Sequence, residues 1–295
     1  MKKIIFILMI LFFLSAFETV CDEETGQQVK AQENMTRQVF SYNEKKIKRS
    51  ESYMVFVQGG TFYMGNKIGS VDERPVHAIT LRSFLISKYE VTFKQYDIFC
   101  DATGKKKPVD RGWGRGKRPV IFVSWYDAVA YCNWLSKING FSPCYNIKGK
   151  KSSCNFYADG YRLPTEAEWE FAAKGGNKSK GYNFSGSNNM DDVSWNKSNS
   201  LYKTNKVGKL EANELGISDL SGNVWEWCWD YYDRTYYTIS PEDNPFGPQK
   251  GKNRILRGGS WYNPARYQTN TVRDYANPES KDDYFGFRIV RTILD

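Results

Sequence analysis

The sequence predicts an α+β domain dominated by irregular loops. Short strand patterns come first, within residues 54–86, and are followed by amphipathic helix patterns that begin at Thr92, Ser124 and Thr165. Beyond the third helix the chain is rich in Gly, Asn, Ser and aromatic residues and shows little periodicity. Because strands and helices do not alternate regularly, the pattern argues against a layered α/β sheet.

The composition is typical of a folded protein. The chain has 295 residues, of which 40% are hydrophobic and 16% aromatic, so it can bury the core of one large domain or of two small ones. The formal net charge is +9, and much of the basic excess lies in two runs, Lys45–Arg49 and Lys105–Lys107. These runs fall in a polar tether and a Gly-rich loop, without a nucleic-acid-binding motif, so we expect no nucleic-acid partner.

Residues 1–20 are predicted to be a signal peptide. Two lysines precede an apolar run from Ile4 to Phe17, which is short for a membrane span; an uncleaved N-terminal anchor is the alternative. Cys21 follows directly, where a bacterial lipoprotein carries its acylated cysteine, although small residues are missing before it. Residues 21–50 are polar and predict a flexible tether. We therefore expect an exported, membrane-anchored lipoprotein at the cell surface, on the outer membrane.

Five further cysteines follow Cys21, so at least one of them stays unpaired within a monomer. Cys144 and Cys154 bracket a segment with Gly149 as a turn, and a hairpin there would bring the two thiols together as a disulfide. The alternative is that both are reduced and buried. Cys100 and Cys132 lie in helix patterns and are expected to pack as small apolar side chains.

Strand patterns open the domain. Met54–Val57 and Thr61–Met64 are expected to be strands joined across Gly59 and Gly60, and Ile79–Ile86 alternates well enough to be a third.

Each helix is predicted by a capping residue followed by apolar side chains at helical spacing. The first follows Thr92, and the second follows Ser124, with Asp127 three residues further on. The third follows Thr165, which forms a capping box with Glu168 and directs Trp169 and Ala172 inward. The apolar face of the second helix comprises Trp125, Ala128, Val129, Cys132, Leu135 and Ile138.

Several long motifs, in order along the chain, resemble the formylglycine-generating-enzyme (sulfatase-modifying factor) domain. The resemblance covers residues 51–293. It implies a C-type-lectin-like fold with two main helices, small antiparallel sheets and many irregular loops. The motifs are Gly59–Gly65, Glu73–His77, Gly160–Glu170, Leu215–Trp227, Arg257–Trp261 and Gly286–Arg288.

The residues that carry the family's known chemistry are absent. Its best-known activity is the copper-dependent oxidation of a sulfatase cysteine, carried by two cysteines just after the Gly-Gly-Ser motif. In this sequence those positions, three and eight residues beyond Ser260, are Asn263 and Gln268, and an amide cannot replace a copper-binding thiolate. A second branch binds iron through histidines, but His77 is the only histidine, and we expect it to be structural. The resemblance therefore predicts no enzyme and no required cofactor.

A calcium site is the one metal that the resemblance suggests, near Asn223, Val224 and Glu226. A side-chain oxygen, a carbonyl and a carboxylate are ligands that calcium prefers. The alternative is that Asn223 satisfies a turn while neighbouring tryptophans fill the core.

The C-terminal segment, residues 257–291, has the composition expected of a contact surface. Two frames, Arg257–Trp261 and Phe285–Val290, enclose a mixture of Tyr, Asn, Asp and Ser that is similar to an antibody combining surface. Trp261, Phe285 and Phe287 are expected to anchor it in the core. Its fourteen contact positions are Tyr262, Asn263, Pro264, Arg266, Tyr267, Asn270, Asp274, Tyr275, Ala276, Asn277, Ser280, Asp282, Asp283 and Tyr284.

This segment resembles the variable region of diversity-generating-retroelement proteins, and in particular treponemal variable proteins. In them a reverse transcriptase rewrites adenines of a template whose codons are mostly AAC or AAT. Such changes never produce Gln, Glu, Lys, Met or Trp, and none of these occupies a contact position. Gln268, Glu279 and Lys281 lie between those positions and must be fixed if the segment is diversified.

The sequence therefore predicts a surface-displayed, non-catalytic protein that binds an unknown protein or cell-surface ligand through a diversified segment. The tyrosines are expected to provide most of the affinity, and Arg266 is placed to pair with an acidic group. Three alternatives stay open. They are a constant binding or assembly module of the same fold, an ordinary polar loop that closes the domain, and a formylglycine-generating oxidase.

Overall fold

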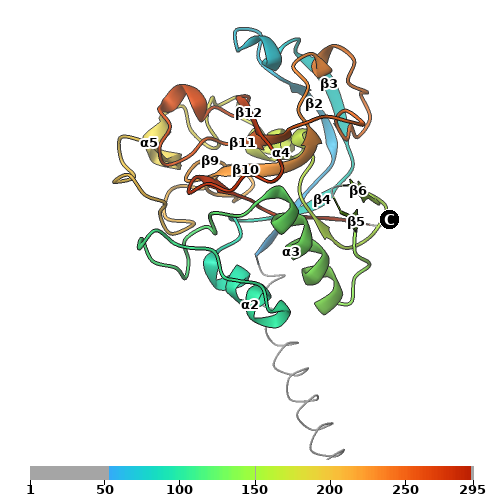
Figure 1. The fold of residues 1–295 in the computed structure, drawn as a ribbon. Coiled ribbons are helices and arrows are strands. Elements are labelled where there is room, and N and C mark those ends of the chain that lie inside the picture. The colour runs from blue at the N-terminus through green and yellow to red at the C-terminus, as the bar shows by residue number, and fades with distance from the viewer. Residues whose placement is uncertain (1–52, 150, 294–295) are drawn as a thin grey trace, which may run out of the picture. The chain divides into compact units, whose positions relative to one another are not determined.

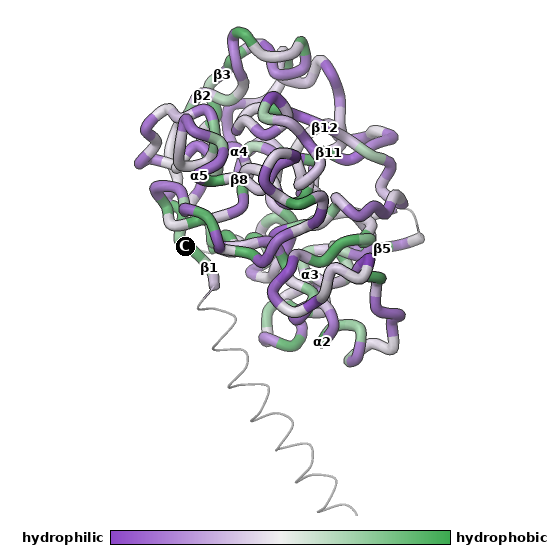
Figure 2. Tube along the Cα trace, turned by 90° about the vertical axis from the view of Figure 1, so that its left-hand side faces the viewer, coloured by the Kyte–Doolittle hydropathy of each residue, from purple (hydrophilic) through white to green (hydrophobic). Residues whose placement is uncertain are grey.

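The computed structural model describes residues 53–149 and 151–293 (Figure 1). The predicted signal peptide, Cys21 and the tether lie outside these residues. Among the described residues no helix is long and apolar enough to cross a membrane. Hydrophobic stretches along the trace are short and interrupted by hydrophilic ones (Figure 2).

One four-stranded sheet joins the beginning of the domain to its end. Its order is β1 (Met54–Val57), β4 (Phe84–Ser87), β14 (Val290–Thr292) and β7 (Tyr161–Arg162). The last strand, β14, lies between β4 and β7 and is antiparallel to both. The C-terminal segment is therefore fixed at its far end to the first strands of the domain.

A second four-stranded sheet carries the beginning of the C-terminal segment. Its order is β12 (Arg273–Ala276), β11 (Arg254–Arg257), β10 (Trp225–Tyr231) and β13 (Phe285–Gly286). β11 is antiparallel to both of its neighbours, whereas β10 and β13 run parallel over two residue pairs. Both ends of the segment thus meet on the central strand β10.

The predicted strands near the N-terminus exist, and the structure supplies their pairing, which the sequence did not specify. β1 and β2 (Gly60–Met64) do not form a hairpin: β1 pairs with β4, and β2 pairs with β3 (His77–Leu81). A Cβ on Gly59 would lie 2.4 Å from Leu81 O, so only glycine allows the close approach at which the chain changes sheets. The single strand expected over residues 79–86 is likewise split between β3 and β4.

The remaining strands form two short pairs. β5 (Tyr145–Lys148) and β6 (Lys151–Cys154) are antiparallel, and β8 (Ser194–Trp195) and β9 (Ser221–Gly222) are parallel.

Helices begin where their capping residues predict. α2 (Phe93–Thr103) is capped by Thr92, α3 (Trp125–Ile138) by Ser124 and α4 (Glu166–Ala173) by Thr165, each in a capping box. A fourth, short helix, α5 (Met190–Val193), lies in the loop-rich half. One detail was wrong: Ile138, assigned to the apolar face of α3, is 41% exposed at the last position of the helix, although Leu135 and Ser136 in the same turn are buried.

Two buried clusters fill the domain. The first lies between α2, α3 and β10 and contains Trp227, whose Nε1 donates to Val123 O at 3.1 Å. The second packs α4 against the inner faces of β1, β4 and β11. The predicted anchors Trp261, Phe285 and Phe287 are all buried. The C-terminal segment therefore begins and ends in the core, as expected.

All five cysteines in the described part of the chain are free thiols. The register of the β5–β6 hairpin places Cys154 opposite Tyr145, not opposite Cys144, so the expected disulfide does not form. Burial raises the pKa of the Cys144 thiol to about 11, which keeps it protonated at neutral pH.

Candidate ligand-binding surface

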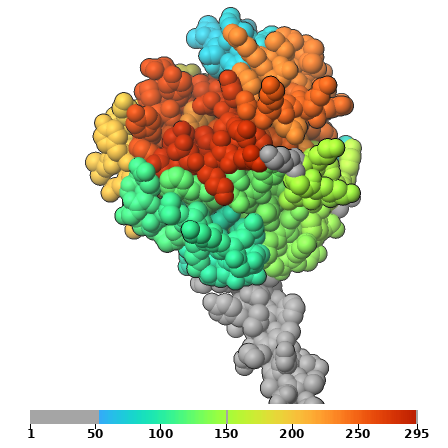
Figure 3. All heavy atoms as spheres, in the orientation of Figure 1, coloured from blue at the N-terminus to red at the C-terminus, as the bar shows by residue number. Residues whose placement is uncertain are grey.

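The C-terminal segment lies across one face of the domain. In Figure 3 it forms a broad band above the residues of α2 and of the loop that follows it. Gly258 and Gly259 turn the chain out of β11 with φ of +96° and +78°. A Cβ on Gly259 would lie 2.6 Å from Tyr267 O, so the close turn requires glycine.

Most of the predicted contact positions are exposed or half-buried. Tyr262 is 52% exposed and Tyr275 is 45% exposed, although the ring of Tyr275 stacks on Tyr232 with the ring centroids 3.9 Å apart. The Arg266 guanidinium lies over the Tyr267 ring, 4.6 Å from its centroid. The positions that reach solvent at least in part are Tyr262, Asn263, Pro264, Arg266, Tyr267, Asp274, Tyr275, Ala276, Asn277, Ser280, Asp282 and Tyr284.

Two contact positions do not lie on the surface, and the expectation was wrong for them. Asn270 is 2% exposed, and its Nδ2 donates to Tyr182 O at 3.0 Å. Asp283 is buried, and its Oδ2 forms an ion pair with Arg111 Nε at 3.2 Å. The loops that carry Tyr182 and Arg111 cover these two positions. The sequence of the segment alone does not show which distant loops pack on it.

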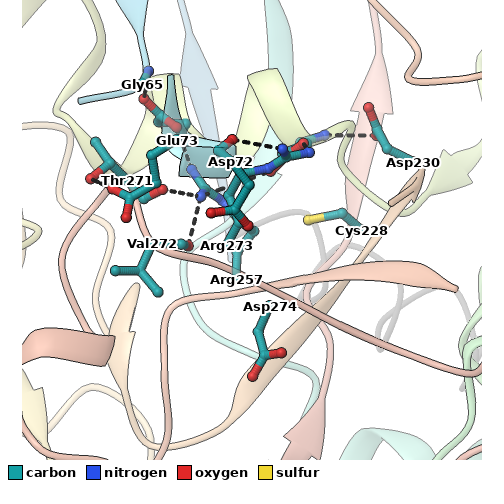
Figure 4. Close-up of polar contacts among 12 residues, drawn as sticks. Gly65, Asp72, Glu73, Cys228, Asp230, Arg257, Thr271, Val272, Arg273 and Asp274 are labelled. Carbon is teal, nitrogen blue, oxygen red and sulfur yellow. Dashed lines mark hydrogen bonds and ion pairs between the residues drawn. The ribbon is translucent and has the colours of Figure 1, made fainter. Parts of the chain in front are cut away.

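Arg257 holds the segment by its main-chain carbonyls. The Arg257 guanidinium donates to Asn270 O at 3.0 Å, Thr271 O at 2.7 Å and Val272 O at 2.6 Å. Figure 4 shows Arg257 beside Thr271 and Val272. These bonds do not depend on which side chains the three residues carry.

The same kind of contact recurs along the rest of the segment. Lys197 N donates to Asn263 O, Phe122 N to Asp282 O, Trp261 Nε1 to Asp283 O and Trp225 N to Tyr284 O, at 2.8–3.1 Å. Every one of these acceptors is the main chain of a predicted contact position. One donor, Trp261, belongs to the frame at the start of the segment, and the other three lie outside the segment.

Residues that the codon argument requires to be fixed include two with structural roles. Gln268 is fully buried, and its Nε2 donates to Ser260 O at 2.9 Å and to Asn263 O at 2.8 Å. Lys281 Nζ pairs with Asp127 Oδ2 at 2.6 Å, at the capped start of α3. Glu279 is exposed.

A buried network of ion pairs supports the segment from beneath. Arg257 pairs with Glu170, and Arg273 Nε pairs with Glu166 Oε1 at 2.6 Å. Burial raises the pKa of Glu170, but Lys174 and Arg257 outweigh it and hold the pKa below its usual value. Arg273 also donates to Asp72 O at 2.8 Å, which ties β12 to the first part of the domain.

Arg257 and Arg273 were not identified as functional from the sequence. Both stand in a segment rich in polar residues, and Arg273 differs in no local feature from the exposed Arg266. Arg257 has no acidic residue nearby in the sequence, which requires a distant partner when such a residue is buried, but Arg273 is followed directly by Asp274 and gives no comparable signal.

The three residues suggested for calcium do not fit that ion in this arrangement. Both carboxylate oxygens of Glu226 bind the Arg288 guanidinium, at 2.6 and 2.7 Å, and one also accepts from Trp169 Nε1. Asn223 Oδ1 accepts from Asn205 N at 2.8 Å, and Val224 is buried. Across residues 53–149 and 151–293 no cluster of three or more His, Cys, Asp or Glu side chains is arranged to hold a metal. Asn223, with φ of +61°, occupies a turn between buried residues, which is the alternative interpretation.

The two amides at the family's cysteine positions lie side by side. The Gln268 side chain contacts the main chain of Asn263, and Asn263 Oδ1 accepts from Ser260 Oγ at 2.6 Å. His77 is elsewhere: its Nδ1 lies 3.0 Å from Pro75 O, and its ring packs on Tyr237 with the centroids 4.7 Å apart.

Comparison with known proteins places this fold in a family. A profile of the sulfatase-modifying factor enzyme 1-like domain matches residues 39–293. The chain belongs to this family. Formylglycine-generating enzyme of Streptomyces coelicolor is 29% identical over 81% of this chain and 89% of its own length. A protein of Paenibacillus barcinonensis named chaperone protein LppX is 37% identical over 70% of this chain and 78% of its own length.

Among solved structures, Treponema denticola variable protein 1 superposes with a TM-score of 0.71 and 32% identity, covering 81% of this chain and 94% of that structure. The fold is therefore that of the formylglycine-generating enzymes and of a variable protein, C-type-lectin-like, with few helices and small sheets.

Proposed function

We propose that this protein is a non-catalytic, surface-displayed ligand-binding protein whose residues 257–291 are diversified by a retroelement. The observation that carries the proposal is the way in which the segment is held. Constant residues bind it through main-chain carbonyls, while twelve of the fourteen contact positions face solvent at least in part. A scaffold of this kind tolerates changes of side chain without loss of the fold.

The likeness to Treponema denticola variable protein 1 supports the same function. Gln268 supports it independently, because a buried amide that bridges two carbonyls is a residue that must not vary.

The absence of thiols from the family's catalytic positions supports a non-catalytic role. Asn263 and Gln268 offer no thiolate for copper, and burial raises the pKa of the Cys228 thiol well above its usual value. The formylglycine-generating relatives are enzymes by name, and a cysteine pair at positions 263 and 268 is what this chain lacks for their reaction.

The proposed location is the cell surface, on the outer membrane. Residues 1–20 serve as the signal peptide, Cys21 as the lipidated residue and residues 21–50 as the tether. The ligand is an unknown protein or other cell-surface molecule. Mass spectrometry of the mature N-terminus tests this part of the proposal, and an unmodified residue after any other cleavage site contradicts it.

Sequencing the end of the gene and the neighbouring DNA in several clones tests diversification. The expected result is a near-identical repeat that differs only where it carries adenine, beside a reverse-transcriptase gene. Variation at Gln268 or Lys281, or the absence of such a repeat, contradicts the proposal.

The second candidate is a constant binding or assembly module of the same fold. The specific observation in its favour is the 37% identity to a protein named as a chaperone. An unchanged segment 257–291 in all sibling genes favours this candidate.

A further inference from the structure

We infer that the loop of residues 197–206 forms a second, fixed contact beside the diversified segment, and that it binds an acidic protein segment carrying an apolar side chain. The inference rests on the proposed binding function and extends it to residues outside the variable region. The first observation concerns the backbone conformation of Leu201 and Tyr202.

Leu201 and Tyr202 are consecutive residues in the left-handed region, with φ of +58° and +54°. Large side chains rarely adopt this conformation, and two in succession are rarer still. Both side chains point into solvent, with 78% and 61% exposed. The backbone strain therefore serves to present two apolar side chains outward, which is the pattern expected at a contact site.

The strained pair is held firmly at its base. Ser200 is fully buried, and its Oγ donates to Trp261 O at 2.9 Å and accepts from Tyr202 N at 3.2 Å. Asn205 Nδ2 donates to Ser200 O at 3.2 Å, which closes the loop. The loop is thus bound to the main chain of Trp261, the buried residue that directly precedes the first contact position of the C-terminal segment.

The loop is continuous with the proposed binding surface. Lys197 N donates to Asn263 O at 3.1 Å, and Lys197 Nζ lies 5.4 Å from the centroid of the exposed Tyr262 ring. Tyr262 thus lies between the loop and the rest of the contact positions. A ligand that covers Tyr262 reaches this loop as well.

The charge of this region is positive. Lys197, Lys203, Lys206 and Arg266 have no ion-pair partner among the described residues. The nearby Asp191 and Asp192 bind only the uncharged side chains of residues such as Asn196 and Ser187, so they keep their negative charges, and the four cations outnumber these two carboxylates. Free cations beside exposed apolar side chains fit a partner that carries a carboxylate next to an apolar residue. The apolar pair favours a protein segment over a polysaccharide or a nucleic acid.

The test selects ligands for the mature chain from a random peptide library displayed on phage. The expected ligands combine an apolar residue with Asp or Glu, and the variant Leu201→Gly/Tyr202→Gly binds them at least roughly tenfold more weakly. Glycine adopts the left-handed conformation without strain, so this variant keeps or raises Tm and its loss of binding does not reflect misfolding. Unchanged binding by the glycine variant, or selection of ligands without acidic residues, overturns the inference.

Charge is tested with Lys197→Glu/Lys203→Glu, against Lys105→Glu/Lys106→Glu in the exposed loop after α2 as the matched control. Only the first pair is expected to lose the acidic peptides. An equal loss in both pairs overturns the local contact and indicates a general charge effect. Selection of no peptide above background, with binding of heparin or DNA instead, also overturns the inference.

A parallel variant, Tyr262→Ala/Tyr267→Ala, separates the inference from the proposed function. Loss of binding in the tyrosine variant alone leaves the proposed function and overturns the fixed contact. Loss in the glycine variant alone supports the fixed contact and contradicts the role of the diversified segment. Loss in both supports both, and loss in neither overturns both.

Discussion

In helix α4 every side chain is buried, including three glutamates, whereas in the turn at residues 262–267 no side chain is fully buried. The glutamates of α4 form ion pairs with Arg273, Arg162 and Arg257, so their carboxylates are not available to a ligand. In the turn the main chain is bound, whereas the side chains of Tyr262, Arg266 and Tyr267 are exposed. Polar side chains therefore have two roles in this protein. In α4 they form buried ion pairs that support the fold, and in the turn at residues 262–267 they are exposed and available to a ligand.

Arg257→Ala is expected to have the largest effect. It removes one of the two cations that pair with Glu170, leaving only Lys174, and it removes the donor for three carbonyls, so the free energy of unfolding falls by about 3–5 kcal/mol. Chemical denaturation measures the change. Arg266→Ala is the matched control from the exposed turn, with a change within about 0.5 kcal/mol. Equal losses of unfolding free energy in the two variants would contradict the difference between a buried supporting residue and an exposed one.

The pH dependence of stability tests another part of the frame. Burial raises the pKa of the Asp219 carboxyl to about 6, although the Gly208 N–H and Arg288 act to lower it. Because the unfolded chain titrates near about 4, the folded state prefers the protonated acid, and stability declines as the pH rises from about 4 to about 6.

Asp219→Asn removes the contribution of this carboxyl to the decline and raises stability at neutral pH by roughly 2 kcal/mol, while the raised pKa values of the buried carboxyls of Asp230 and Glu90 leave part of the decline in place. Urea denaturation across this pH range measures it, with the exposed Asp243→Asn as the control, for which the pH profile should not change. A profile for Asp219→Asn that falls as steeply between these pH values as that of the unchanged protein would contradict the assignment.

Gln268→Leu is expected to cost roughly 1–3 kcal/mol, because Ser260 O and Asn263 O lose a buried donor. The measurement is thermal or urea denaturation, with Asn277→Leu as an exposed control from the same segment. If Gln268→Leu leaves the free energy of unfolding unchanged, Gln268 is not a structural residue and belongs with the positions that can vary.

Tyr262→Ala/Tyr267→Ala should change stability least, by no more than about 1 kcal/mol for the pair. Binding of any identified ligand should nevertheless be abolished, since exposed tyrosines supply contact area at low entropic cost. Calorimetry of unfolding and of binding checks the two halves of this prediction. A large loss of stability would show that these tyrosines belong to the core.

Local features were predicted well. The starts of α2, α3 and α4 followed from Thr92, Ser124 and Thr165, because a capping box is formed within four residues and needs no distant partner. The family followed from its motifs, which are read in order along the chain. The burial of Trp261 and Phe287 followed from their size and lack of charge.

Pairing and burial were predicted less well. The sequence predicted β1 and β2 but not their partners: each strand pairs with one further along the chain, and local alternation does not specify which edge will be available. Asn270 and Asp283 were expected at the surface, yet the loops carrying Tyr182 and Arg111 cover them.

The sequence by itself determined where the helices start, which family the chain belongs to and that no thiol stands at positions 263 and 268. Only the tertiary structure decided which polar residues of the C-terminal segment support the fold and which face solvent. It also decided that Leu201 and Tyr202 are held in a left-handed backbone. The physical reason is that capping and composition are local properties, whereas burial and backbone strain depend on segments that meet only when the chain has folded.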